Sequence, residues 1–185
     1  MNLPNTLTIV RILLIPAFVI FIINHNYIYA LLTFAVAGMT DGLDGLIARL
    51  TRQKTELGAY LDPIADKLLL ISAYLSLAIV EILPGWLSVI VITRDVLILL
   101  GILVIILISR PPQIHPSFIS KMTTTFQILT VLLSLLGGFN PSPKPLIPIA
   151  IYGTTFLTIL SGIHYIYVGT RLLNQRNDWE HPKRR

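Results

Sequence analysis

The sequence contains no cysteine and few charged residues. Without cysteine, the chain forms neither disulfides nor thiolate metal sites. Charged residues make up only 12% of the chain, whereas an ordinary soluble domain has about 25%. Hydrophobic residues make up 54%, and the mean hydropathy is +0.77. This composition argues against a soluble globular protein and indicates a chain embedded in lipid.

Long apolar stretches account for nearly all of the 185 residues. A helix needs about 20 residues to cross the hydrocarbon core of a bilayer. Six stretches of this kind are present, and we expect spans at about 7–24, 28–49, 57–80, 84–109, 120–139 and 146–169. No stretch is left for a separate soluble domain. Residues 1–185 are therefore predicted to form a single all-α integral membrane domain with six transmembrane helices.

Basic residues fall mainly on the side of the predicted membrane that holds both termini. They are Arg49, Arg52, Lys54, Arg110, Lys121, Arg171, Arg176, Lys183, Arg184 and Arg185. The loops on the other side carry only Lys144. Since loops rich in Lys and Arg stay in the cytoplasm, both termini are expected to be cytoplasmic. The same asymmetry explains the net charge of +5, so nucleic acid is not an expected partner.

The N-terminal apolar segment is expected to be a retained first helix. Residues 12–23 follow Arg11, but they lead into Asn24-His25-Asn26-Tyr27 and not into a small-residue cleavage site. No transit-peptide character is visible. These features favour the plasma (inner) membrane of a prokaryote.

Four aspartates stand close together in the sequence, within this apolar chain. Asp41 and Asp44 are three residues apart, and Asp62 and Asp66 are four apart, so each pair shares one helix face. Two antiparallel helices joined by a short cytoplasmic loop can bring the two faces together. Carboxylates at membrane depth are costly and persist mainly when they are paired or functional.

Four neighbouring anions repel one another unless a cation neutralises them. Carboxylate oxygens without His or Cys suit Mg²⁺ or Mn²⁺ better than zinc. Four carboxylates can hold two such ions, the arrangement that clamps the attacking and leaving oxygens in phosphoryl displacement. The aspartates therefore predict a two-metal site for phosphoryl chemistry.

Glycines and an arginine accompany the aspartates. Gly42 and Gly45 allow a bulky headgroup to approach the backbone, and Arg49 can form a bidentate contact with a phosphate. A single membrane-embedded Asp–Arg pair is often structural. A cation carrier lined by aspartates would need carboxylates in several helices at mid-membrane and has no use for these glycines. The aspartate-rich motifs of prenyltransferases bracket longer loops in larger proteins.

The full pattern is Asp-x-x-Asp-Gly-x-x-Ala-Arg-x₈-Gly-x₃-Asp-x₃-Asp, running from Asp41 to Asp66. It resembles the defining motif of the CDP-alcohol phosphatidyltransferase family, and every fixed position is met. The opening Leu3–Arg11, the stretch Leu61–Lys67 and the closing Leu160–Tyr165 are similar to the branch that contains phosphatidylglycerophosphate synthase and the CMP-forming cardiolipin synthase.

The resemblance implies six transmembrane helices, a homodimer and a polar cavity facing the cytoplasm. It implies transfer of a phosphatidyl group from CDP-diacylglycerol to an alcohol, with release of CMP. Asp41, Asp44 and Asp62 match metal ligands, and Asp66 matches both a metal ligand and the base that deprotonates the acceptor. The positions that match contacts to the CDP moiety are Asn5, Thr8, Gly45, Arg49 and Thr55.

The acceptor is expected to be an anionic alcohol. Arg94 lies well inside the fourth span and Lys121 opens the fifth, so both are candidates for binding it. An alternative is that Arg94 simply pairs with an aspartate. The branch resemblance leaves two activities open, with glycerol 3-phosphate as the first choice of acceptor. Phosphatidylglycerol is the alternative, because the stretches Thr93–Val96 and Pro116–Lys121 are more similar to cardiolipin synthases.

Overall fold

The computed structural model describes the backbone of residues 3–51, 56–108, 118–140 and 142–180, and the side chains of 8–40, 64–101, 118–140, 142–168 and 170. These residues form the helices α1 (Leu3–Ile23), α2 (Tyr27–Thr51), α3 (Glu56–Ile79), α4 (Gly85–Ile108), α5 (Phe118–Phe139) and α6 (Leu146–Glu180). The predicted six-helix, all-α architecture is confirmed for the described residues.

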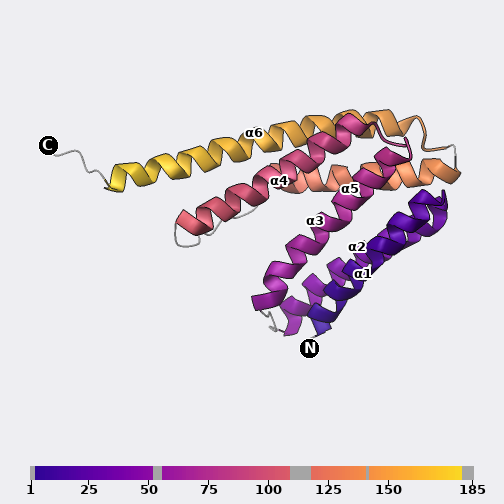
Figure 1. Ribbon diagram of the computed structural model, residues 1–185, viewed down its shortest axis with the longest axis horizontal. Coiled ribbons are helices and arrows are strands. Elements are labelled where there is room, and N and C mark those ends of the chain that lie inside the picture. Colours follow the sequence, from indigo (N-terminus) through magenta and orange to yellow (C-terminus); the bar gives the residue numbers. More distant parts are fainter. Residues whose placement is uncertain (1–2, 52–55, 109–117, 141, 181–185) are drawn as a thin grey trace.

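The main difference from the expected spans is the length of α6. This helix continues to Glu180, whereas the span was expected to end near residue 169. In Figure 1 its C-terminal part projects beyond the neighbouring helices. Hydropathy marks where a segment stops being apolar, but a helix ends only where its backbone hydrogen bonding ends.

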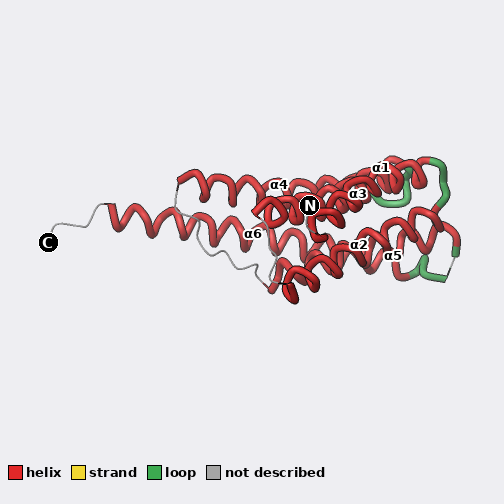
Figure 2. Tube along the Cα trace, turned by 90° about the horizontal axis from the view of Figure 1, so that it is seen from below, coloured by secondary structure: helices red, strands yellow, loops and turns green. Residues whose placement is uncertain are grey.

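The helices pack as a closed ring. The order of neighbouring helices round the ring is α1, α3, α4, α6, α5 and α2, and α2 in turn contacts α1. α3 also contacts α5 across the ring, so it touches three other helices. The α1–α2, α3–α4 and α5–α6 connections lie together at one end (Figure 2). The end of α2 and the start of α3, which carry the aspartate motif, lie toward the opposite end.

Two of the three connections use non-glycine residues in the left-handed conformation. His25 has φ 56° after α1, and Glu81 has φ 60° after α3. At the first turn the Asn26 N–H donates to the Phe21 carbonyl at 2.9 Å, and the second turn has the equivalent bond. This is the Schellman pattern, which satisfies carbonyl groups at the end of a helix. It reverses the chain tightly enough for consecutive helices to pack side by side.

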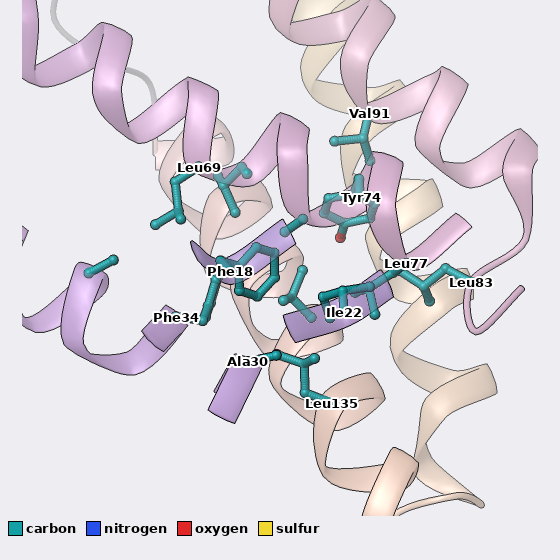
Figure 3. Close-up of a cluster of buried hydrophobic side chains, with 14 of the residues drawn as sticks. Phe18, Ile22, Ala30, Phe34, Leu69, Tyr74, Leu77, Leu83, Val91 and Leu135 are labelled. Carbon is teal, nitrogen blue, oxygen red and sulfur yellow. The ribbon is translucent and has the colours of Figure 1, made fainter. Parts of the chain in front are cut away.

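A hydrophobic cluster occupies the part of the ring nearer these turns. Phe18 of α1 and Phe34 of α2 lie with their ring centroids 5.7 Å apart, and Tyr74 and Leu77 of α3 approach the same centre (Figure 3). The Tyr74 hydroxyl, which is buried, donates to the backbone carbonyl of Gln127 at 3.1 Å. The cluster also includes residues of α4, so it ties α1, α2, α3, α4 and α5 together.

Polar side chains are buried inside the bundle beside the apolar cluster, and many large apolar side chains are exposed on its outside, which suits a chain surrounded by lipid. The buried polar set is Thr8, Arg11, Ser76, Ser88, Arg94, Asp95, Thr123, Gln127, Thr130, Ser134, Thr154, Thr158 and Ser161. Leu13, Ile79, Ile149, Phe156 and Ile163 are among the exposed apolar residues. By length and composition, two described stretches can cross a membrane, Phe118–Phe139 and Leu146–Val168.

We expect Gly138→Ala to destabilise the bundle. A Cβ at Gly138 would lie 2.6 Å from ring atoms of Tyr27, so this side chain and the start of α2 would have to shift. Such overpacking costs about 1–3 kcal/mol. Gly101→Ala is the matched control, because nothing lies within 4 Å of the added Cβ. The thermal unfolding midpoint of the detergent-purified protein should fall for Gly138→Ala alone, and equal midpoints for the two variants would contradict the packing described here.

Candidate active site

The predicted metal ligands lie on two helices. Asp41 and Asp44 are in the C-terminal half of α2, and Asp62 and Asp66 are in the N-terminal half of α3. Of the four, Asp66 has a described side chain. Thr55 lies outside the described residues, as do the side chains of Asp41, Asp44, Asp62, Asn5, Gly45 and Arg49.

Asp66 forms an ion pair with an arginine of α1. Nη1 of Arg11 donates to Oδ1 of Asp66 at 2.7 Å. The arginine side chain is fully buried, whereas that of Asp66 is 42% exposed. Asp66 supplies the counter-charge that a buried guanidinium at membrane depth needs. It also fixes the Asp66 carboxylate against α1 while leaving part of it accessible.

The next residue on α3, Lys67, is tied to the other side of the bundle. Its Nζ lies 2.8 Å from Oδ2 of Asp95, which belongs to α4 and is completely buried. The neighbouring Arg94 donates from Nη1 to Oδ1 of the same carboxylate at 2.6 Å. Asp95 therefore holds two cations, one on each oxygen.

Arg94 connects this group to α5 and α6. Its Nη2 donates to the hydroxyls of Ser120 at 2.8 Å and Ser161 at 2.7 Å. The guanidinium carbon also lies 5.8 Å from the centroid of the Tyr165 ring, within the range of a cation–π contact. With Arg11–Asp66 and Lys67–Asp95, these contacts form a belt of charged and polar groups that links five of the six helices. We call these residues the ionic belt.

Asp66, the predicted ligand with a described side chain, is compatible with a bound divalent cation. Asp66 offers a partly exposed carboxylate, and hard divalent cations prefer such oxygen ligands. No group of three or more His, Asp or Glu side chains close enough to hold a metal occurs among the residues with described side chains. The aspartate quartet remains a prediction, since three of its side chains lie outside that set.

The structure describes the surroundings of three other predicted site residues, and their roles in binding stay predictions. Arg94 pairs with an aspartate, as the alternative interpretation held, and its partner is the adjacent Asp95. Lys121 is exposed on α5, and it is the preceding Ser120 that contacts Arg94. Thr8 is fully buried on α1, one turn before Arg11. Its expected role in binding CDP stays a prediction.

The sequence reasoning missed the partners of these charges. The Arg11–Asp66 pair joins residues 55 positions apart, and no local pattern reveals such a contact. Arg11, Lys67 and Asp95 are all charged residues inside predicted apolar segments. Because charges at membrane depth pair with one another, the sequence does indicate that each of them needs a partner. Ser161 and Tyr165 offered no comparable signal.

We expect Asp95→Asn to destabilise the protein strongly. The change leaves the buried Arg94 and the neighbouring Lys67 without their shared counter-charge, and such losses cost about 3–5 kcal/mol. Replacing both residues, Arg94→Met with Asp95→Asn, removes the unpaired guanidinium and should recover part of this loss. Thermal unfolding of the three proteins measures the effect. A double variant no more stable than Asp95→Asn would show that the pair is not coupled.

Curated relatives resemble the chain over most of its length. A human protein named cardiolipin synthase (CMP-forming) is 33% identical over 194 aligned positions, covering 96% of this chain and 64% of the human one. Two bacterial relatives are named CDP-diacylglycerol–glycerol-3-phosphate 3-phosphatidyltransferase. The one from Haemophilus influenzae is 36% identical, and the match covers 90% of this chain and 92% of the relative. The one from Bacillus subtilis is 30% identical, and the match covers 95% of this chain and 99% of the relative. The chain thus spans less than two thirds of the human relative.

The family match includes the residues of the candidate site. The model of the CDP-alcohol phosphatidyltransferase family matches residues 1–163. That range contains the whole motif from Asp41 to Asp66 and the ionic belt except Tyr165. The chain therefore belongs to the CDP-alcohol phosphatidyltransferase family, a family of membrane enzymes.

Proposed function

We propose that the protein transfers the phosphatidyl group of CDP-diacylglycerol to glycerol 3-phosphate and releases CMP. The observation that carries the proposal is the complete Asp41–Asp66 motif within the family match. Relatives named for the glycerol 3-phosphate reaction match over nearly their full length, up to 99% in Bacillus subtilis. This supports glycerol 3-phosphate as the first choice of acceptor.

Phosphatidylglycerol is the second candidate acceptor, which would make the protein a CMP-forming cardiolipin synthase. Its support is the similarity to the human and Drosophila melanogaster proteins that carry this name, at 33% and 36% identity. Both candidate acceptors present a glycerol hydroxyl at one end and a phosphate at the other. The two reactions therefore share their chemistry at the transferred phosphorus.

In the proposed mechanism, the acceptor hydroxyl attacks the β-phosphorus of the CDP-lipid. A bond forms between the acceptor oxygen and that phosphorus, the bond from the phosphorus to the CMP oxygen breaks, and CMP leaves. The hydroxyl proton passes to a carboxylate, for which Asp66 is the candidate. Arg11 contacts Oδ1 of this carboxylate, and the Asp66 side chain remains partly exposed.

Asp41, Asp44, Asp62 and Asp66 would hold two Mg²⁺ or Mn²⁺ ions. Such ions neutralise the diphosphate and stabilise the charge that develops on the leaving group. The CDP moiety would be bound by Asn5, Thr8, Gly45, Arg49 and Thr55. Arg94 and Lys121 are the proposed contacts to the anionic acceptor, with Arg94 held in place by Asp95 and two serines.

The cellular setting belongs to the same proposal. The distribution of Lys and Arg supports a multi-pass protein in the plasma membrane, with both termini and the site facing the cytoplasm. There the site meets a water-soluble acceptor, while the acyl chains of the donor stay in the bilayer. The family resemblance further suggests a homodimer.

An acceptor screen tests the function. Purified protein is incubated with labelled CDP-diacylglycerol, Mg²⁺ or Mn²⁺, and either glycerol 3-phosphate or phosphatidylglycerol. We expect CMP release with glycerol 3-phosphate. Release with phosphatidylglycerol alone would transfer the assignment to the second candidate. An absence of CMP release with either acceptor would contradict the proposal.

We expect Asp62→Asn to lower turnover by about 100-fold or more, since removing one group that stabilises transition-state charge has effects of this size. Mn²⁺ binding, followed by electron paramagnetic resonance, should weaken in the same variant while the protein still inserts and folds. Glu81→Gln is the matched control, because this exposed carboxylate lies in the turn after α3 at the far end. Unchanged Mn²⁺ binding in Asp62→Asn would refute the metal role.

A further inference from the structure

Lys67 is the most accessible cation of the ionic belt. Its side chain is 22% exposed, against 4% for Arg94 and none for Arg11. It lies on α3 directly after Asp66, the residue proposed to accept the proton. No role was assigned to it from the sequence pattern.

The ammonium of Lys67 has hydrogen-bonding capacity to spare. It lies 2.8 Å from Oδ2 of Asp95, yet this oxygen has no properly directed hydrogen bond among the described residues. The contact therefore supplies charge neutralisation more than directional bonding. A lysine ammonium carries three N–H donors, and these can turn toward a third group. By contrast, Nη2 of Arg94 already serves two serines.

The charge balance around Asp95 favours an anion. Lys67 and Arg94 contribute two positive charges and Asp95 one negative charge, which leaves one positive charge in a mostly buried setting. Electrostatic attraction is stronger here than in water, because the effective dielectric constant is lower. The Arg11–Asp66 pair next to it is neutral. Counted over the described side chains alone, a phosphate that approaches the exposed side of Lys67 would thus meet a net positive charge.

The position of Lys67 suits the shape of the acceptor. Asp66 and Lys67 are consecutive on α3, so their side chains leave the helix about 100° apart, one toward α1 and the other toward α4. Glycerol 3-phosphate and phosphatidylglycerol both carry a phosphate separated from the reacting hydroxyl by a three-carbon glycerol unit. An acceptor that lies across α3 between the two side chains would have its phosphate at Lys67 and its hydroxyl toward Asp66.

We propose that Lys67, oriented by Asp95, binds the phosphate of the acceptor alcohol and thereby positions its hydroxyl beside Asp66. The inference rests on the proposed function and adds a residue to its acceptor site. Asp95 is a positioning residue in this arrangement, since it touches the ammonium and not the acceptor. Lys67 would act together with Arg94 and Lys121, the acceptor contacts already proposed.

The test is steady-state kinetics of CMP release with Lys67→Met, Lys67→Gln and Lys67→Arg. Each acceptor is used in a separate arm with CDP-diacylglycerol and Mg²⁺. In the arm that supports turnover, both neutral variants should raise the KM for the acceptor about 10- to 100-fold, the size expected for a lost charge-assisted hydrogen bond. The KM for CDP-diacylglycerol should stay near that of the wild type. Lys67→Arg should recover most of the acceptor affinity.

Lys144→Met is the matched control, because Lys144 is an exposed lysine in the α5–α6 connection. It should leave all kinetic constants unchanged. Thermal unfolding of each variant separates a binding effect from a folding effect, and Lys67→Gln provides a second neutral side chain if Lys67→Met does not fold. A merely structural role would raise both KM values or lower kcat without selective loss of the acceptor.

The two possible failures are distinguishable. If the wild type turns over but folded neutral variants keep its acceptor KM, the assignment of Lys67 is wrong and the proposed function stands. If the wild type releases no CMP with either acceptor, the proposed function fails and takes this inference with it.

Discussion

The pairing of charges inside an apolar bundle is the constraint on which the rest of the structure depends. Isolated charges at membrane depth are costly, so each must find a counter-charge or a set of hydrogen-bonding groups. Arg11 meets Asp66, Lys67 and Arg94 share Asp95, and Arg94 also uses two serine hydroxyls. These requirements fix which faces of α1, α3, α4, α5 and α6 turn inward. The ionic belt therefore specifies the arrangement of the helices as well as the chemistry at their centre.

The two ends of the bundle have different roles. Near the turns, Phe18, Phe34 and Tyr74 pack into an apolar cluster that joins five helices. Toward the aspartate end, polar contacts replace apolar ones. An apolar core is close-packed and deforms little, whereas ion pairs can exchange partners when a charged ligand arrives. The apolar cluster therefore gives the site a close-packed support, while the site itself is held by ion pairs.

Much of this organisation could be predicted from the sequence, for physical reasons. Hydropathy locates apolar helices well, because a bilayer demands about 20 apolar residues for each crossing, and six helices appear near the expected positions. The aspartate spacing indicated one helix face on α2 and one on α3. Tertiary partners could not be predicted: nothing near Arg11 in the sequence points to Asp66, and nothing near Arg94 points to Ser120. Such contacts depend on helix rotation, which composition leaves undetermined.

The central position of α3 has a mechanical consequence. Asp66 and Lys67 are consecutive, yet their partners lie on α1 and on α4, on different sides of the same helix. A twist of α3 about its long axis would slacken one contact and compress the other at the same time. The proposed proton acceptor and the proposed phosphate-binding group are thus coupled through α3, and a change in the acceptor alcohol would have to involve the helices that flank it.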